Sequence, residues 1–552
     1  MPPGDLPGVR AQLRGVVADL AAGRNCLWLV TDALVESGLA DELYRGALFG
    51  SPVRVDVPAP ASARARVEEE EAGEAGVQGE RGEEPGPDEA DTAAWAGGGA
   101  WADGDELPYL DLPDDGFDLD LGWALEDHRP RVPAPRKESA GPRHDPHGLL
   151  ARLGKELSVD ADQAVATLVA PDRDRRPVVG IRAWTEEDHD SGTGTGARTG
   201  AGTGTFTATG ARTPGAAVER LFRLLAAAVK DAGLPPGERP RLLVVARLRD
   251  LPESLPDELR HGLGDTAVHW WWGVLGRLDT ATAVAPILDR GPDTSGRDRD
   301  PLAERIRRAV RSETVVEVCG PDLELARLLA LEWDGAQHTL GAVLGRCLAA
   351  SPRPGPADCP PLRRIGALLR PGAELRQAWA AGAVVSWEGR LRAHVGVWHP
   401  AAATALKGPA APTAPAAGPP PAPDGGARAR LAALVSQAQQ RVLTPWIEEA
   451  RQRLAVRALG HLNRPVATLV ADYADRPPAH AGGDPERAFL ELQVGELLRA
   501  HISGALALPP RDAALLRLLV TARNVLAHRS VLYDRTLDEL CAELSQADLR
   551  AS

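Results

Sequence analysis

Short apolar runs alternate with helical patterns through the first four hundred residues of the chain. The apolar runs are NCLWLVTD at 25–32, PVVGIRAW at 177–184, RLLVVARL at 241–248, AVHWWWGVLGRL at 267–278 and TVVEVC at 314–319. Apolar residues at helical spacing fill the segments 215–233, 301–312 and 322–335. Because strands of four to eight residues alternate here with longer helices, the pattern predicts an α/β domain with a largely parallel sheet.

The pattern changes after residue 427, where β-branched runs disappear and helical periodicity takes over. Four stretches carry it, beginning with ARARLAALV, DPERAFLEL, PRDAALLRL and DRTLDELCA. These stretches predict a C-terminal all-α helical bundle. The expected fold class is therefore multidomain: an N-terminal α/β domain with disordered insertions, followed by the bundle.

Three stretches of low complexity suggest where the domains begin and end. Residues 59–146 are acidic and rich in Gly and Pro, which predicts a disordered insertion. Residues 191–213 alternate Gly with Thr and predict a surface loop, and residues 400–427 form an Ala/Pro linker. We therefore predict that residues 1–58 begin the α/β domain, that 147–399 complete it, and that 428–552 form the bundle.

The composition of the chain indicates which partners and which cellular compartment to expect. The 63 Lys and Arg residues against 77 Asp and Glu residues give a formal charge of −14, which argues against a general nucleic-acid-binding surface, so any RNA site must be local. The five cysteines show no CxxC or Cys/His pairing, which predicts neither a zinc module nor a disulfide framework and fits a reducing cytoplasm. No segment reaches the length of apolar residues that crosses a bilayer, so we expect a cytoplasmic protein without membrane contact.

An α/β domain of this kind invites a search for phosphate-binding loops. The sequence contains no GxxxxGK[ST] motif, and the segment after the first apolar run carries Asp32 and Glu36 where a phosphate would favour a cation. Arg247 stands near the position of a metal-binding acid after the run RLLVVARL. The strand order and the following helix loosely resemble the core of AAA or STAND-type NTPases, in a degenerate form for which we expect no bound cofactor. Asp322 is expected to cap a helix.

The run HWWWG at 269–273 could stack a base or a peptide. Three adjacent tryptophans on a strand point to alternating faces, however, so packing in a core or between domains is the favoured interpretation.

One polar stripe stands out in the third helical stretch of the predicted bundle. Leu515, Leu518, Leu519, Ala522 and Leu526 recur at the spacing of a buried face, whereas a second stripe is polar. Its members follow at i, i+4, i+7 and i+11: Arg517, Thr521, Asn524 and His528. Arg523 lies off this line, with an arm long enough to reach toward a phosphate near His528.

These side chains match the requirements of RNA cleavage without a metal. The 2′-hydroxyl attacks the adjacent phosphate, which needs proton transfers near neutral pH and a cation for the crowded phosphorane. Histidine suits the first task and arginine the second. One helix supplies one histidine, so two copies facing one another would complete the set. In an acidic protein, Arg517 and Arg529 would have to help bind the RNA.

The segment RNVLAH at 523–528 resembles the Arg-x4-6-His motif of HEPN domains, in the form where Asn follows Arg. The resemblance covers roughly residues 427–552 and implies a composite, metal-independent endoribonuclease site in a homodimer. Arg523 and His528 would then be catalytic and Asn524 would orient the site or the RNA, with no metal. We expect a bacterial defence or toxin effector regulated by the α/β domain. The alternative is a non-enzymatic adaptor with an inactive bundle, acting with a partner ATPase or another defence-system protein.

Overall fold

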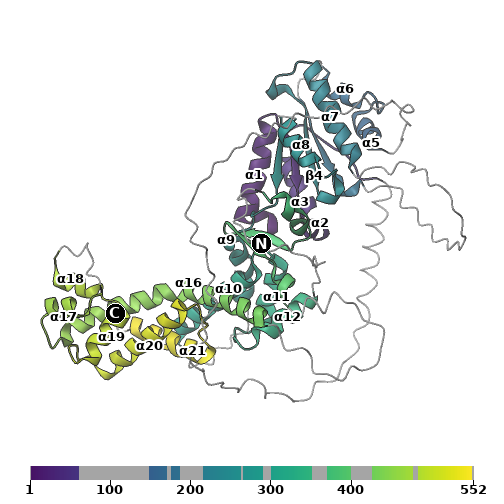
Figure 1. The fold of residues 1–552 in the computed structure, drawn as a ribbon. Coiled ribbons are helices and arrows are strands. Elements are labelled where there is room, and N and C mark those ends of the chain that lie inside the picture. The colour runs from purple at the N-terminus through teal and green to yellow at the C-terminus, as the bar shows by residue number, and fades with distance from the viewer. Residues whose placement is uncertain are drawn as a thin grey trace, which may run out of the picture. The chain divides into compact units, whose positions relative to one another are not determined.

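The computed structural model describes residues 2–60, 148–170, 176–186, 215–262, 265–289, 300–350, 370–399, 425–475 and 483–549 (Figure 1). The predicted insertion at 59–146, the Gly/Thr loop at 191–213 and the linker at 400–427 lie wholly or almost wholly outside these ranges. Among the described residues, no helix combines the length and the apolar character that crossing a membrane requires.

A parallel sheet occupies the N-terminal half, as the apolar runs predict. Its five strands are β1 (Asn25–Leu29), β2 (Arg54–Asp56), β3 (Val178–Arg182), β4 (Arg241–Ala246) and β5 (Thr266–Trp270). They lie in the order β2-β3-β4-β1-β5, and every neighbouring pair is parallel. Since β1, β3 and β4 are almost wholly buried, their continuous apolar runs are those of strands covered on both faces.

Helices cover the sheet on both faces. Three aligned residues on neighbouring strands point to one face of the sheet: Gly180 of β3, Leu243 of β4 and Cys26 of β1. On this face Gly180 lies against α3 (Leu39–Phe49), and Cys26 lies against α1 (Pro7–Ala21). α5 (Leu149–Leu157), α6 (Ala164–Val169) and α7 (Ala216–Asp231) pack on one another, and Figure 1 shows them across the strands from α1. The remaining helices of this part are α2 (Asp32–Glu36) and α8 (Leu255–Gly262).

The close approach of α3 to the sheet depends on Gly180. A Cβ atom at this position would lie 2.9 Å from both Tyr44 Cζ and Leu48 Cδ2, and Tyr44 is fully buried. We expect Gly180→Ala to lower the free energy of unfolding by about 1–3 kcal/mol, because α3 must move away from the strand. Urea denaturation measures the change. Gly15→Ala in α1, where a Cβ would meet open space, should instead raise stability by about 0.5–1 kcal/mol.

A second group of elements follows the sheet along the chain. It comprises α9 (Arg277–Asp289), α10 (Pro301–Cys319), α11 (Leu323–Glu332), α12 (Leu340–Ala350), α13 (Arg376–Ala380), the hairpin β6 (Val384–Trp387) and β7 (Arg390–Ala393), and α14 (Val395–Trp398). The strand predicted at 314–319 is wrong, because these residues form the last turns of α10. Its valines are buried on several sides of the helix, so tertiary burial outweighs their β propensity.

After residue 424 the described regular elements are helices, apart from one isolated β-bridge between Leu462 and Leu506. The α-helices are α16 (Gly425–Ala458), α17 (Val466–Tyr473), α18 (Pro485–Leu490), α19 (Val494–Ile502), α20 (Pro510–Ala527) and α21 (Asp534–Leu549). The helical stretch that begins with DPERAFLEL, predicted as one helix, forms two, α18 and α19, because Gln493 is the N-cap of α19 and forms a capping box with Glu496. We call these helices the C-terminal helical region.

The helix α10 belongs to two hydrophobic cores. Ala303, Ile306 and Val310 of its first half pack into the core of the C-terminal helical region, whereas its second half packs with α11 and α12. Two buried glutamates on the same helix, Glu313 and Glu317, accept hydrogen bonds from Arg441 of α16 at 3.0 and 3.1 Å. The C-terminal helical region therefore completes its core with residues that precede the predicted linker. The domain boundaries given above remain predictions.

Candidate functional site

The residues RNVLAH form the end of α20. Its apolar face is buried as predicted, with Leu518 only partly covered, whereas Arg523, Asn524 and His528 are exposed. His528 is the C-cap of the helix, and its backbone N–H donates to the carbonyl of Asn524. The side chains of Asn524 and His528 make no hydrogen bond or ion pair within the described residues, so both are available to a ligand.

The helix ends in a Schellman motif. The N–H of Arg529 donates to the carbonyl of Leu526, and the N–H of Ser530 donates to the carbonyl of Val525, both at 3.0 Å. Glycine is the usual residue after the C-cap, because φ is positive there, but this chain has Arg529 with φ 53°. The position therefore carries conformational strain and holds a guanidinium next to His528.

Arg523 leans away from the stripe toward α19. Its Nη2 donates to Gln493 Oε1 at 3.2 Å, and the side chain lines a hollow of about 170 Å³ with Glu448, Arg451 and Leu526. Neither Asn524 nor His528 lines this hollow. Within this chain the structure thus places the two predicted catalytic side chains on neighbouring faces of one helix, at its exposed end.

The predicted RNA-binding arginines are spread along α20. Arg529 adjoins His528, but Arg517 is eleven residues earlier, roughly 16 Å along the helix axis at 1.5 Å per residue. Thr521, between them on the stripe, donates its hydroxyl to the carbonyl of Arg517. The arginines form a line toward His528 rather than a cluster around it.

The loop that follows His528 is tied to two other parts of the chain. Leu532 exchanges two hydrogen bonds of 2.8 Å with Gln439 of α16, whose side chain is fully buried. Asp534 accepts from the backbone N–H of Gln337 at 2.8 Å and lies 3.2 Å from His338 Nδ1. The end of α20 is therefore connected, within a few residues, to the loop between α11 and α12.

A cavity opens at the carboxyl ends of β1 and β5 in the N-terminal half. Its volume is about 700 Å³, and it lies at the edge of the sheet where open α/β folds bind ligands. Its wall carries the carboxylates of Glu42, Asp322 and Glu324 against the guanidinium of Arg327. This charge balance is a poor complement to phosphate.

The residues that stand where an NTPase would bind phosphate or metal form ion pairs within the chain. Asp32 lies 3.4 Å from Arg249, and Arg247 is paired with Asp250 in a capping box. Asp322 caps α11, as predicted, by accepting from Leu325. The run Trp270 to Trp272 is buried, at 5–8% exposed, as the packing interpretation predicts, and Trp271 and Trp272 also line the cavity at the carboxyl ends of β1 and β5.

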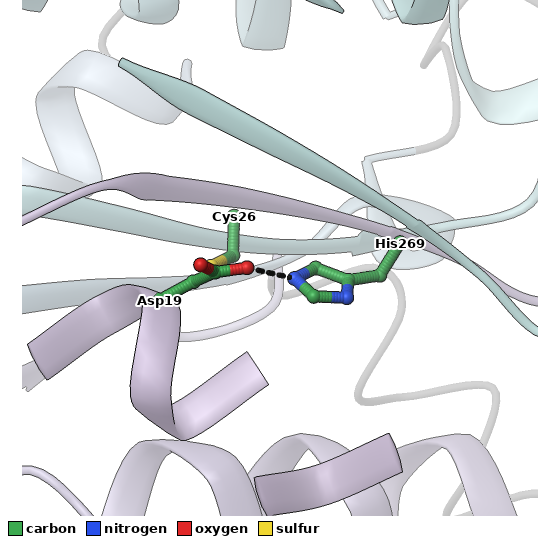
Figure 2. Close-up of side chains that lie close together, drawn as sticks. All are labelled: Asp19, Cys26 and His269. Carbon is green, nitrogen blue, oxygen red and sulfur yellow. Dashed lines mark ion pairs between the residues drawn. The ribbon is translucent and has the colours of Figure 1, made fainter. Parts of the chain in front are cut away.

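Sequence reasoning missed a cluster on the face of the sheet covered by α1. Asp19 lies near the end of α1, Cys26 near the start of β1 and His269 on β5, and their ligand atoms all lie within 4.8 Å of one another. Figure 2 shows the three side chains converging between the helix and the strands, with His269 Nε2 2.9 Å from Asp19 Oδ2. The other carboxylate oxygen of Asp19 accepts from Arg24, also at 2.9 Å.

Burial dominates the electrostatics of this cluster. It raises the pKa of the Cys26 thiol, and the nearby Asp19 carboxylate raises it further. It also lowers the pKa of His269, which the same carboxylate partly offsets. Because His269 is 243 positions from Cys26, no local spacing signals the cluster. Only the pairing of β5 with β1 brings them together.

Comparison with known proteins gives no relative, since no protein family, curated protein or solved structure matches this chain.

Proposed function

We propose that the chain is a metal-independent endoribonuclease whose active site forms between two copies of the C-terminal helical region. The observation that carries this proposal is the end of α20, where Asn524 and His528 are exposed and unpaired among the described residues. Arg529 beside them is held in a conformation that glycine would adopt with less strain. Ser158 and Glu388 also have a positive φ, so the exposed, unpaired side chains of Asn524 and His528 carry the proposal.

In the proposed reaction, His528, Arg523 and Asn524 each have a separate task. A His528 imidazole removes the proton of the 2′-hydroxyl, which attacks the adjacent phosphorus, and the partner's His528 protonates the leaving 5′-oxygen. The products are a 2′,3′-cyclic phosphate and a 5′-hydroxyl. Arg523, freed from Gln493, binds the phosphorane through its forked guanidinium. Asn524, one turn before His528, orients the RNA.

The N-terminal half would act on this site through the loop that follows it. His528 is six residues from Asp534, which binds the loop between α11 and α12. A movement of α11 or α12 would therefore shift the end of α20 and the spacing of a composite site. This connection supports regulation by the N-terminal half.

The test uses the full chain, because α10 contributes to the core of the C-terminal helical region. We would incubate it with tRNA and total RNA in EDTA, beside a His338→Ala variant that loosens the loop at Asp534. We expect fragments ending in cyclic phosphate, with more cleavage by the variant. If neither protein cleaves RNA although both are folded dimers, the non-enzymatic adaptor becomes the better explanation of the exposed stripe.

Position 529 should separate stability from activity. We expect Arg529→Gly to raise the free energy of unfolding by about 0.5–1 kcal/mol, because glycine accepts a positive φ without strain. The same change should weaken RNA cleavage, since one phosphate-binding cation is lost. Denaturation and cleavage assays on one preparation measure both.

The control for this change is Ser158→Gly at the end of α5, where φ is 59°. This variant should gain comparable stability and cleave RNA at the normal rate. Unchanged cleavage by Arg529→Gly would show that this arginine takes no part in binding RNA.

A further inference from the structure

The cluster of Asp19, Cys26 and His269 brings three kinds of metal ligand to one point. A carboxylate oxygen, a sulfur and an imidazole nitrogen come from α1, β1 and β5, and all three atoms lie within 4.8 Å of one another. Zn²⁺ binds each of these ligand types, with bonds of about 2.0–2.3 Å that place neighbouring ligand atoms roughly 3.3–3.6 Å apart. The nitrogen and the oxygen, now 2.9 Å apart, must separate slightly, and any longer pair must shorten by up to about 1 Å, to reach that geometry.

The contacts already present leave the ligand atoms free to converge. Arg24 occupies Oδ1 of Asp19, so Oδ2 remains for the shared point. Although Oδ2 lies 2.9 Å from His269 Nε2, the nitrogen does not donate along a hydrogen-bond direction to any group of the described chain. Among the described residues, the Cys26 thiol donates one hydrogen bond, of 3.7 Å, to the carbonyl of Val16.

We propose that Asp19, Cys26 and His269 bind one Zn²⁺ ion through Oδ2, Sγ and Nε2. The thiol releases its proton to solvent on binding, so a carboxylate and a thiolate balance the charge of the ion. The side chains of Asp19 and His269 are 25% and 17% exposed, although His269 Nε2 itself is buried. The ion therefore enters when these two side chains move, and water takes the fourth position. The ion fastens the end of α1 to β1 and β5.

This assignment is independent of the ribonuclease, whose residues lie on α20 and need no metal. It departs from the sequence-based expectation that the chain lacks a metal site. That expectation rested on the absence of closely spaced cysteine and histidine motifs, whereas here the third ligand comes from a neighbouring strand.

The experiment titrates the metal-free full chain with Co²⁺, which substitutes for Zn²⁺ and gives an absorption band when a thiolate binds it. We expect one Co²⁺ per chain, a thiolate band in the near ultraviolet, and loss of that band on adding Zn²⁺. Cys26→Ala and His269→Gln should abolish the band. Cys541→Ala, which removes a buried thiol from α21, is the matched control and should keep it.

Two results would overturn the assignment: a folded wild-type chain without the band, or a band that survives in Cys26→Ala. Circular dichroism checks the fold of each variant. If Cys26→Ala fails to fold, Asp19→Asn at the partly exposed side of the cluster decides instead. We expect it to lower the affinity for Co²⁺ at least tenfold, and an unchanged affinity would contradict the site.

Discussion

His528→Ala should lower the rate of RNA cleavage by a factor of about 10²–10⁴, the usual contribution of a positioned general acid or base. The loss should be large because both histidines of a composite site disappear with one substitution. The free energy of unfolding should change by less than about 0.5 kcal/mol, since His528 is exposed and its side chain has no partner within the described chain. Cleavage rates and urea denaturation on the same preparation measure the two effects.

Ser530→Ala, an exposed position two residues further on, is the matched control and should cleave RNA at the wild-type rate. Arg523→Lys adds a second comparison, because lysine keeps the charge but lacks the fork that holds two phosphate oxygens. Equal cleavage by wild type and His528→Ala would exclude this histidine from the chemistry.

Arg451→Met should destabilise the C-terminal helical region by about 3 kcal/mol. Arg451 is 2% exposed, and its Nη1 donates to the carbonyls of Leu490 and Leu492 at 2.7 and 2.9 Å. These hydrogen bonds attach α16 to the turn between α18 and α19. A methionine fills a similar volume but leaves the buried carbonyl of Leu492 and the partly buried carbonyl of Leu490 without this donor. Each buried acceptor left unpaired costs roughly 1–3 kcal/mol. The change is measured as the shift in the midpoint of denaturation.

The control for Arg451 is Arg535→Met. Arg535 is 92% exposed and pairs with Glu539 one turn further along α21, so its loss should cost no more than about 0.5 kcal/mol. A similar loss in the free energy of unfolding of the two variants would mean that the hydrogen bonds of Arg451 stabilise the fold no more than an exposed ion pair does.

Periodicity along the chain predicted the parallel sheet and the helical C-terminal region, because burial on both faces produces continuous apolar runs such as RLLVVA in β4. The periodicity predicted the wrong element where the local sequence pattern and the burial in the folded chain disagree. Val315, Val316 and Val318 read as a strand, yet they continue α10 without a break and are buried from more than one side. The short edge strand β2 was not predicted, since its three residues are only partly buried.

The candidate sites divide in the same way. The stripe on α20 was predictable, because its members lie on one helix and its apolar face is sharply defined. The strained conformation of Arg529 was not, because the sequence places no Gly or Asn at that position to signal the end of the helix. The cluster of Asp19, Cys26 and His269 depends on which strands are neighbours in the sheet, and no pattern within a single segment contains that information.

Because α10 packs in two hydrophobic cores, it mechanically connects the two halves of the chain. A helix is stiff along its axis, and α10 has side chains in two separate hydrophobic cores. Arg441 of α16 also donates a hydrogen bond to Glu313 of this helix. We expect a rotation at its carboxyl end, near Val316 and Cys319, to move Ile306, which packs in the core of the C-terminal helical region. We therefore expect a ligand that moves one half of the chain to shift the other half through α10, without contacting that half.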